Sequence, residues 1–123
     1  MKFPTLKIGK FIPKYPIIQG GMAIRASMSR LAAAVANQGG IGVIAGSAIS
    51  AEEMVQEIKK AKSMTKGIIA VNIMFAVTDF KEQVMAAVEA GVDFIISGAG
   101  FSRDMFTIGK EAGIPIVPIV SSL

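Results

Sequence analysis

One polar side chain interrupts the longest apolar run that has the pattern of a strand. Asn72 lies within Ile68–Phe75, where every other residue is apolar. A buried amide without a hydrogen-bond partner costs about 1–3 kcal/mol, so Asn72 must have one. An amide can both donate and accept, which suits a ligand edge that carries N–H and carbonyl groups. The alternative is an amide that bonds to neighbouring backbone inside the fold.

Two small-residue segments follow other apolar runs and could make room for a ligand. Gly20 and Gly21 end the run that starts at Pro16, and Met22 and Ala23 follow them. Two missing side chains would let a flat ring lie against the backbone, and Met22 would offer a soft, polarizable edge. A tight turn explains the same glycines.

The second such segment is Ser97-Gly98-Ala99-Gly100. Its small residues would leave space for a substrate, and Ser97 would place a hydroxyl at the rim of that space. An ordinary turn between a strand and a helix remains an alternative.

These segments alternate with helical patterns along the whole chain. The sequence predicts strands at Pro16–Gln19, Ile41–Ala45, Ile68–Phe75, Phe94–Ser97 and Ile116–Val120. Glycines with left-handed backbone are expected to end the preceding helices, at Gly39, Gly67, Gly91 and Gly113. This order predicts an α/β fold with a parallel sheet covered on both faces.

Helix starts are also marked. Ser50 followed by Glu53 predicts a capping box that opens a helix ending near Met64, and Thr78–Asp79 predicts the start of the next helix. Periodicity does not distinguish an open doubly wound sheet from part of an eight-stranded barrel.

Three motifs distinguish the two folds through a resemblance. They are Pro16-Ile17-Ile18-Gln19-Gly20-Gly21-Met22-Ala23 with the stretch Leu31–Gly42, then Val71-Asn72-Ile73-Met74, and Ile95-Ile96-Ser97-Gly98-Ala99-Gly100. From about Pro16 to Ser122 the chain resembles the nitronate monooxygenase family and its sibling, the FMN-dependent enoyl-acyl-carrier-protein reductases II. The resemblance implies a (β/α)8 TIM barrel, of which residues 1–123 would be the N-terminal part, about five βα units of a single domain.

The resemblance also implies site residues and an activity. FMN would contact Gly20, Gly21, Met22, Ala23 and Asn72, and Ser97, Gly98 and Ala99 would line the substrate pocket. The implied reaction is oxidation of alkyl nitronates with dioxygen, and the sibling alternative is reduction of an enoyl thioester. The family's catalytic histidine and phosphate site would follow Leu123, so we expect no catalytic residue here, an inactive fragment, and a further part that completes the barrel.

Composition narrows the remaining classes of function. Cysteine and histidine are absent, which argues against thiolate chemistry and a metal site, and the net charge of +4 is scattered, which argues against nucleic-acid binding. The uncharged stretch 32–50 is interrupted by turn residues, and no export signal is visible, so we expect a cytoplasmic protein without a membrane span. A small-molecule substrate is expected, with homo-oligomerisation open. A flavodoxin-like domain and a non-catalytic assembly piece are alternatives.

Overall fold

The computed structural model describes residues 2–122, and helices and strands alternate along them. The elements are α1 Ser29–Asn37, β1 Ile41–Ala45, α2 Ala51–Met64, β2 Ile68–Met74, α3 Phe80–Glu89, β3 Phe94–Gly98, α4 Arg103–Ala112 and β4 Ile116–Pro118. The predicted α/β alternation is confirmed. Within the described residues, no helix combines the length and the apolar character that crossing a bilayer requires.

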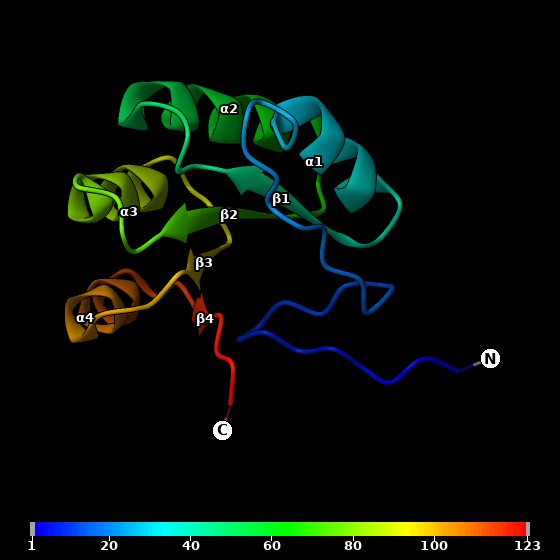
Figure 1. Ribbon diagram of the computed structural model, residues 1–123. Coiled ribbons are helices and arrows are strands. Elements are labelled where there is room, and N and C mark those ends of the chain that lie inside the picture. Colours follow the sequence, from blue (N-terminus) through cyan, green and yellow to red (C-terminus); the bar gives the residue numbers. More distant parts are fainter. Residues whose placement is uncertain (1, 123) are drawn as a thin grey trace.

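The four strands form one parallel sheet in the order β1-β2-β3-β4. Figure 1 shows the helices along the outer side of this curved sheet and the N-terminal segment on the opposite side. A doubly wound sheet would change direction in its strand order, whereas a barrel adds each strand beside the previous one. The observed order is therefore that of a barrel segment.

Both faces of the sheet are covered, as the continuous apolar strands predicted. The outer face packs on the helices through one buried cluster, which includes Ile44, Met54, Ile58, Val71, Ile73, Val84 and Ile95. The inner face forms a second cluster of Ile41, Val43, Ala70, Phe94 and Ile96, which Leu6, Ile8 and Phe11 of the N-terminal segment cover. Burial of these apolar surfaces is the main stabilising term for the fold.

The prediction of a regular strand at Pro16–Gln19 is wrong. It makes a single parallel bridge, between Ile18 and Ile41. The backbone N–H of Gln19 donates to the Ile41 carbonyl over 3.0 Å, and its side-chain amide then replaces the backbone, with Nε2 3.1 Å from the Val43 carbonyl and Oε1 3.2 Å from the Val43 nitrogen. Because a side chain satisfies Val43, the backbone leaves the sheet after Gln19.

Ser27 fixes the loop that follows. Its side chain is completely buried, and its hydroxyl accepts hydrogen bonds from Gln19 Nε2 over 3.0 Å and from the Met22 N–H over 2.9 Å. The same hydroxyl donates to the Gly20 carbonyl over 3.0 Å. One hydroxyl thereby uses its donor and both lone pairs to hold the two ends of the loop together.

Three of the four predicted helix-ending glycines have the expected left-handed backbone. The φ angles are 93° at Gly39, 82° at Gly91 and 69° at Gly113. The prediction is wrong for Gly67, because α2 ends instead at Thr65 in extended backbone. An added Cβ at Gly67 would lie 2.7 Å from the Ala36 carbonyl oxygen, so this glycine permits a close approach rather than a left-handed turn.

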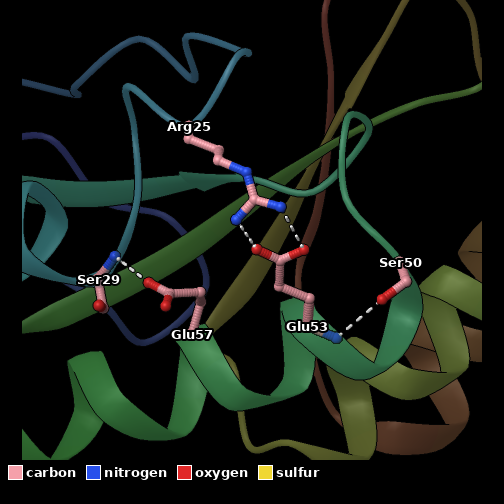
Figure 2. Close-up of polar contacts among 5 residues, drawn as sticks. All are labelled: Arg25, Ser29, Ser50, Glu53 and Glu57. Atoms are coloured by element: carbon pink, nitrogen blue, oxygen red, sulfur yellow. Dashed lines mark hydrogen bonds and ion pairs between the residues drawn. The ribbon is translucent and has the colours of Figure 1, made fainter.

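One of the two hydrogen bonds of the predicted capping box is present. The Ser50 hydroxyl accepts a hydrogen bond from the Glu53 N–H over 3.1 Å, as predicted. The Glu53 carboxylate does not return to Ser50 and instead pairs with the Arg25 guanidinium (Figure 2). In α3, Asp79 occupies the predicted cap position, but its side chain makes no capping hydrogen bond.

The start of α1 is capped by a residue of another helix. Met28 offers no side-chain cap, and the Ser29 N–H donates to Glu57 Oε2 of α2 over 2.7 Å (Figure 2). Burial raises the pKa of Glu57, but the hydrogen bonds from Ser29 and the charges of Lys60 and Arg25 outweigh it and lower the pKa overall. The ionised carboxylate therefore stabilises the N-terminus of α1.

We predict that Glu57→Gln destabilises the protein near neutral pH by the amount of a lost helix cap, about 1 kcal/mol. Because the folded-state pKa of Glu57 is lowered, its contribution is present above the ordinary pKa and disappears as pH falls through the folded-state value. The difference between variant and parent should therefore shrink in acid. Urea unfolding at about pH 7 and about pH 3 measures it. A difference that is equal at both values would contradict the assignment.

We also predict that Ser27→Ala lowers the free energy of unfolding by about 2–3 kcal/mol, because it removes the three hydrogen bonds of a fully buried hydroxyl. Ser63→Ala is the matched control, since the Ser63 hydroxyl is exposed and donates only to the Lys60 carbonyl. The control should change stability by less than about 0.5 kcal/mol. Thermal and urea denaturation compare the two, and equal effects would refute the role given to Ser27.

Candidate functional site

A recess of about 230 Å³ opens where β1, β2 and β3 end. Its lining comes from these strand ends and from the loops beyond them: Gly21, Ala23, Ala45, Ser47, Asn72, Met74, Gly98 and Ala99. The carboxyl ends of parallel strands are the edge at which α/β folds bind ligands. The lining includes residues from all three segments that the sequence analysis selected.

Asn72 lies on the inner face of β2, between Ala45 of β1 and Ile96 of β3. Its Oδ1 atom is buried and has no hydrogen-bond partner among the described residues. For this oxygen, the structure therefore does not support the alternative that the amide hydrogen-bonds to neighbouring backbone. An unpaired buried carbonyl oxygen costs about 1–3 kcal/mol, and a bound donor would recover that cost.

Two glycines place no side chain against the Asn72 amide. A Cβ added at Gly21 would lie 2.7 Å from Asn72 Cβ and 3.1 Å from its Nδ2, and one at Gly98 would lie 3.1 Å from its Oδ1. Gly20, by contrast, has open space around it and does not line the recess. Any larger residue at Gly21 or Gly98 would press on the amide, so these two glycines shape the recess.

The structure places the two predicted residues that follow Gly21 differently. Ala23 lines the recess, whereas Met22 does not and has 53% of its surface exposed. The structure thus brings Gly21, Ala23 and Asn72 together and leaves Gly20 and Met22 outside the lining.

Ser97 does not place a hydroxyl at the rim, and that prediction is wrong. Its side chain is fully buried, and its hydroxyl donates to the Gly100 carbonyl over 2.6 Å. This hydrogen bond closes a turn in which Ala99 has a φ of 53°. Left-handed backbone at a non-glycine residue costs about 1–2 kcal/mol, so Ser97 supports a strained turn that presents Gly98 and Ala99 to the recess.

The loop before α1 is strained as well. Ile24 and Arg25 have φ values of 55° and 57°, which is unusual for a β-branched residue such as Ile24. Ile24 is 92% exposed, and Arg25 is tied to Glu53 of α2 (Figure 2). This ion pair is largely exposed, so it contributes about 0.2–1 kcal/mol, and the buried Ser27 hydroxyl is the stronger anchor of the loop.

Sequence reasoning missed three lining residues, Ala45, Ser47 and Met74. The sequence position of Ser47 could have indicated its role. It follows a predicted strand and one glycine, and such a position lies at the ligand-binding edge of a parallel sheet. Within residues 2–122, no three or more acidic side chains come together as they would around a metal ion.

Comparison of sequences relates this chain to known proteins. Residues 5–92 match the family model described as nitronate monooxygenase. The chain is 40% identical over 73 residues to a probable nitronate monooxygenase of Staphylococcus saprophyticus, covering 59% of this chain and 20% of that protein. It is 28% identical over 109 residues to a (3aS,4S,5R,7aS)-5-hydroxy-7a-methyl-1-oxo-octahydro-1H-indene-4-carboxyl-CoA dehydrogenase of Mycobacterium tuberculosis, covering 89% of this chain and 30% of the relative.

Solved structures show the same fold. FabK of Thermotoga maritima superposes with a TM-score of 0.84 at 31% identity, over 89% of this chain and 35% of FabK. Nitroalkane oxidase of Streptomyces ansochromogenes superposes with a TM-score of 0.81 at 21% identity, over 89% of this chain and 41% of that protein, which is evidence of fold alone. The sheet is thus a segment of a TIM barrel, and the chain spans about a third of the length of most of these relatives. From its strand order, its recess and its match over residues 5–92, the chain belongs to the nitronate monooxygenase family.

Proposed function

We propose that this chain forms the ring-facing part of the site of an FMN-dependent oxidoreductase that oxidises alkyl nitronates with dioxygen. The observation that supports this proposal is the buried, unpaired Oδ1 of Asn72 at the ligand-binding edge of the sheet. Family membership supports the class of enzyme.

The recess has the features that a flavin ring requires. A flavin has an imide edge with one N–H and two carbonyl oxygens, and Asn72 offers both an acceptor and a donor group. Gly21 and Gly98 keep that amide free of side-chain cover. When bound, FMN supplies the electron-transfer chemistry, and these residues hold and orient its ring.

The chain contributes orientation rather than acid-base catalysis. It has no histidine, and among the residues that line the recess none is acidic or basic. Because the chain spans about a third of its relatives, we assign the family's histidine base and phosphate site to the rest of a complete barrel. We further propose a small-molecule substrate and a cytoplasmic location.

A second candidate function is the FMN-dependent reduction of an enoyl thioester. The superposition on FabK at 31% identity and the match to a carboxyl-CoA dehydrogenase favour it. Oxygen consumption with an alkyl nitronate, compared with nicotinamide oxidation in the presence of an enoyl thioester, separates the two in the complete barrel.

We predict that, in the complete barrel, Asn72→Leu weakens FMN binding by about 1–3 kcal/mol, because the flavin edge loses a hydrogen-bond partner. Without cofactor the variant should be as stable as the parent or more stable, since leucine has a similar volume and removes a buried oxygen that has no partner. Fluorescence titration with FMN and thermal unfolding without it measure the two effects.

Asn37→Leu is the matched control for this experiment. Asn37 lies at the end of α1, and its exposed amide donates to the Met64 carbonyl. The control should leave flavin affinity unchanged. Unchanged affinity in Asn72→Leu together with a sharp loss of stability would make Asn72 a structural amide and would remove the main support for the proposal.

A further inference from the structure

We propose that Ser47 is a further cofactor-binding residue, whose hydroxyl donates a hydrogen bond to a carbonyl oxygen of the flavin's imide edge. This inference rests on the proposed function, because it concerns the same recess. It assigns a role to a residue that neither the sequence motifs nor the resemblance singled out.

Backbone hydrogen bonds place Ser47 beside the end of β2. It follows β1 by two residues, and the intervening Gly46 donates its N–H to the Asn72 carbonyl over 2.9 Å. The Ser47 hydroxyl oxygen then accepts the N–H of Met74 over 2.6 Å. Ser47 is half-buried and lines the recess together with Asn72.

The Ser47 hydroxyl has a proton to give. A hydroxyl carries one donor and two lone pairs, and the Met74 N–H uses one lone pair. Among residues 2–122 this hydroxyl takes part in one hydrogen bond, as the acceptor from Met74, and in none as a donor. Accepting the Met74 N–H also polarises the hydroxyl and makes it a stronger donor.

The unsatisfied groups in the recess specify the kind of ligand. Ser47 offers a hydroxyl donor, and Asn72 offers an amide donor and the buried acceptor Oδ1. An imide has one N–H, which could donate to Asn72 Oδ1, and two carbonyl oxygens, which could accept from the Asn72 amide and the Ser47 hydroxyl. A phosphate or ionised carboxylate only accepts hydrogen bonds, so it would leave Oδ1 without a partner.

Titration with ring-only flavins tests Ser47 without relying on a phosphate site or on activity. The probes are lumiflavin and its 2-thio and 4-thio analogues, in which a weakly accepting sulfur replaces one carbonyl oxygen. The proteins are the unsubstituted chain, Ser47→Ala, and the matched control Ser63→Ala, whose hydroxyl lies on the exposed end of α2. Circular dichroism checks that each variant is folded.

Ser47→Ala should bind lumiflavin about five- to tenfold more weakly, which corresponds to about 1.0–1.4 kcal/mol. The unsubstituted chain and Ser63→Ala should prefer lumiflavin to one of the two thio analogues by a similar factor, and Ser47→Ala should lose that preference. This loss of selectivity is the signature of a direct hydrogen bond, because a structural role would weaken all three probes alike.

Two other results separate the inference from the proposed function. If the unsubstituted chain binds lumiflavin, and Ser47→Ala binds each probe as tightly as the unsubstituted chain does or binds all three more weakly by the same factor, the role of Ser47 is overturned and the flavin proposal stands. If the unsubstituted chain binds none of the three probes, the proposed function is overturned and the role of Ser47 with it.

Discussion

The register of the parallel strands is the constraint on which the recess depends. Ala45, Asn72 and Ile96 are partners across three neighbouring strands, so the carboxyl ends of these strands reach the same level of the sheet. A shift of one residue in β2 would turn Asn72 to the outer face, where Val71 and Ile73 pack against the helices. The apolar residues on both faces prevent that shift, because each face has its own buried cluster.

Polar side chains inside this fold divide into two kinds. Ser27, Gln19 and Glu57 make hydrogen bonds within the chain, and they hold the first loop and the start of α1 in place. Asn72 and Ser47 retain bonding capacity that the chain does not use, and Gln83 Oε1 of α3, outside the recess, is a second buried oxygen without a partner. An unpaired buried oxygen is costly, and at Asn72, which lines the recess, a bound donor would remove that cost.

The edge of the recess also holds the strained backbone. Left-handed residues other than glycine occur at Ile24 and Arg25, in the loop that contributes Gly21 and Ala23, and at Ala99, directly after Gly98 of β3. The Ser27 hydroxyl and the Arg25–Glu53 ion pair hold the first loop. The Ser97 hydroxyl holds the turn that contains Ala99. The strain is thus localised where backbone must come close to the space that a ligand would occupy.

The amino-acid sequence by itself determined the succession of elements and the chemistry of the recess. β-branched runs, helix caps and left-handed glycines are local signals, and they located four of the five predicted strands and the start of α2. The amide of Asn72 was also evident, because a polar residue in an apolar strand is costly wherever the strand lies. Only the tertiary structure decided which atoms lack partners. The Gln19 amide satisfies Val43 across 24 residues, Glu53 turns from Ser50 to Arg25, and Ser97 bonds its own turn while Ser47 faces the recess. The contacts of Gln19 and Glu53 join segments that are distant in the sequence, and spacing along the chain does not encode such contacts. The Ser97 hydrogen bond is local, but it depends on the left-handed backbone of Ala99 in its turn.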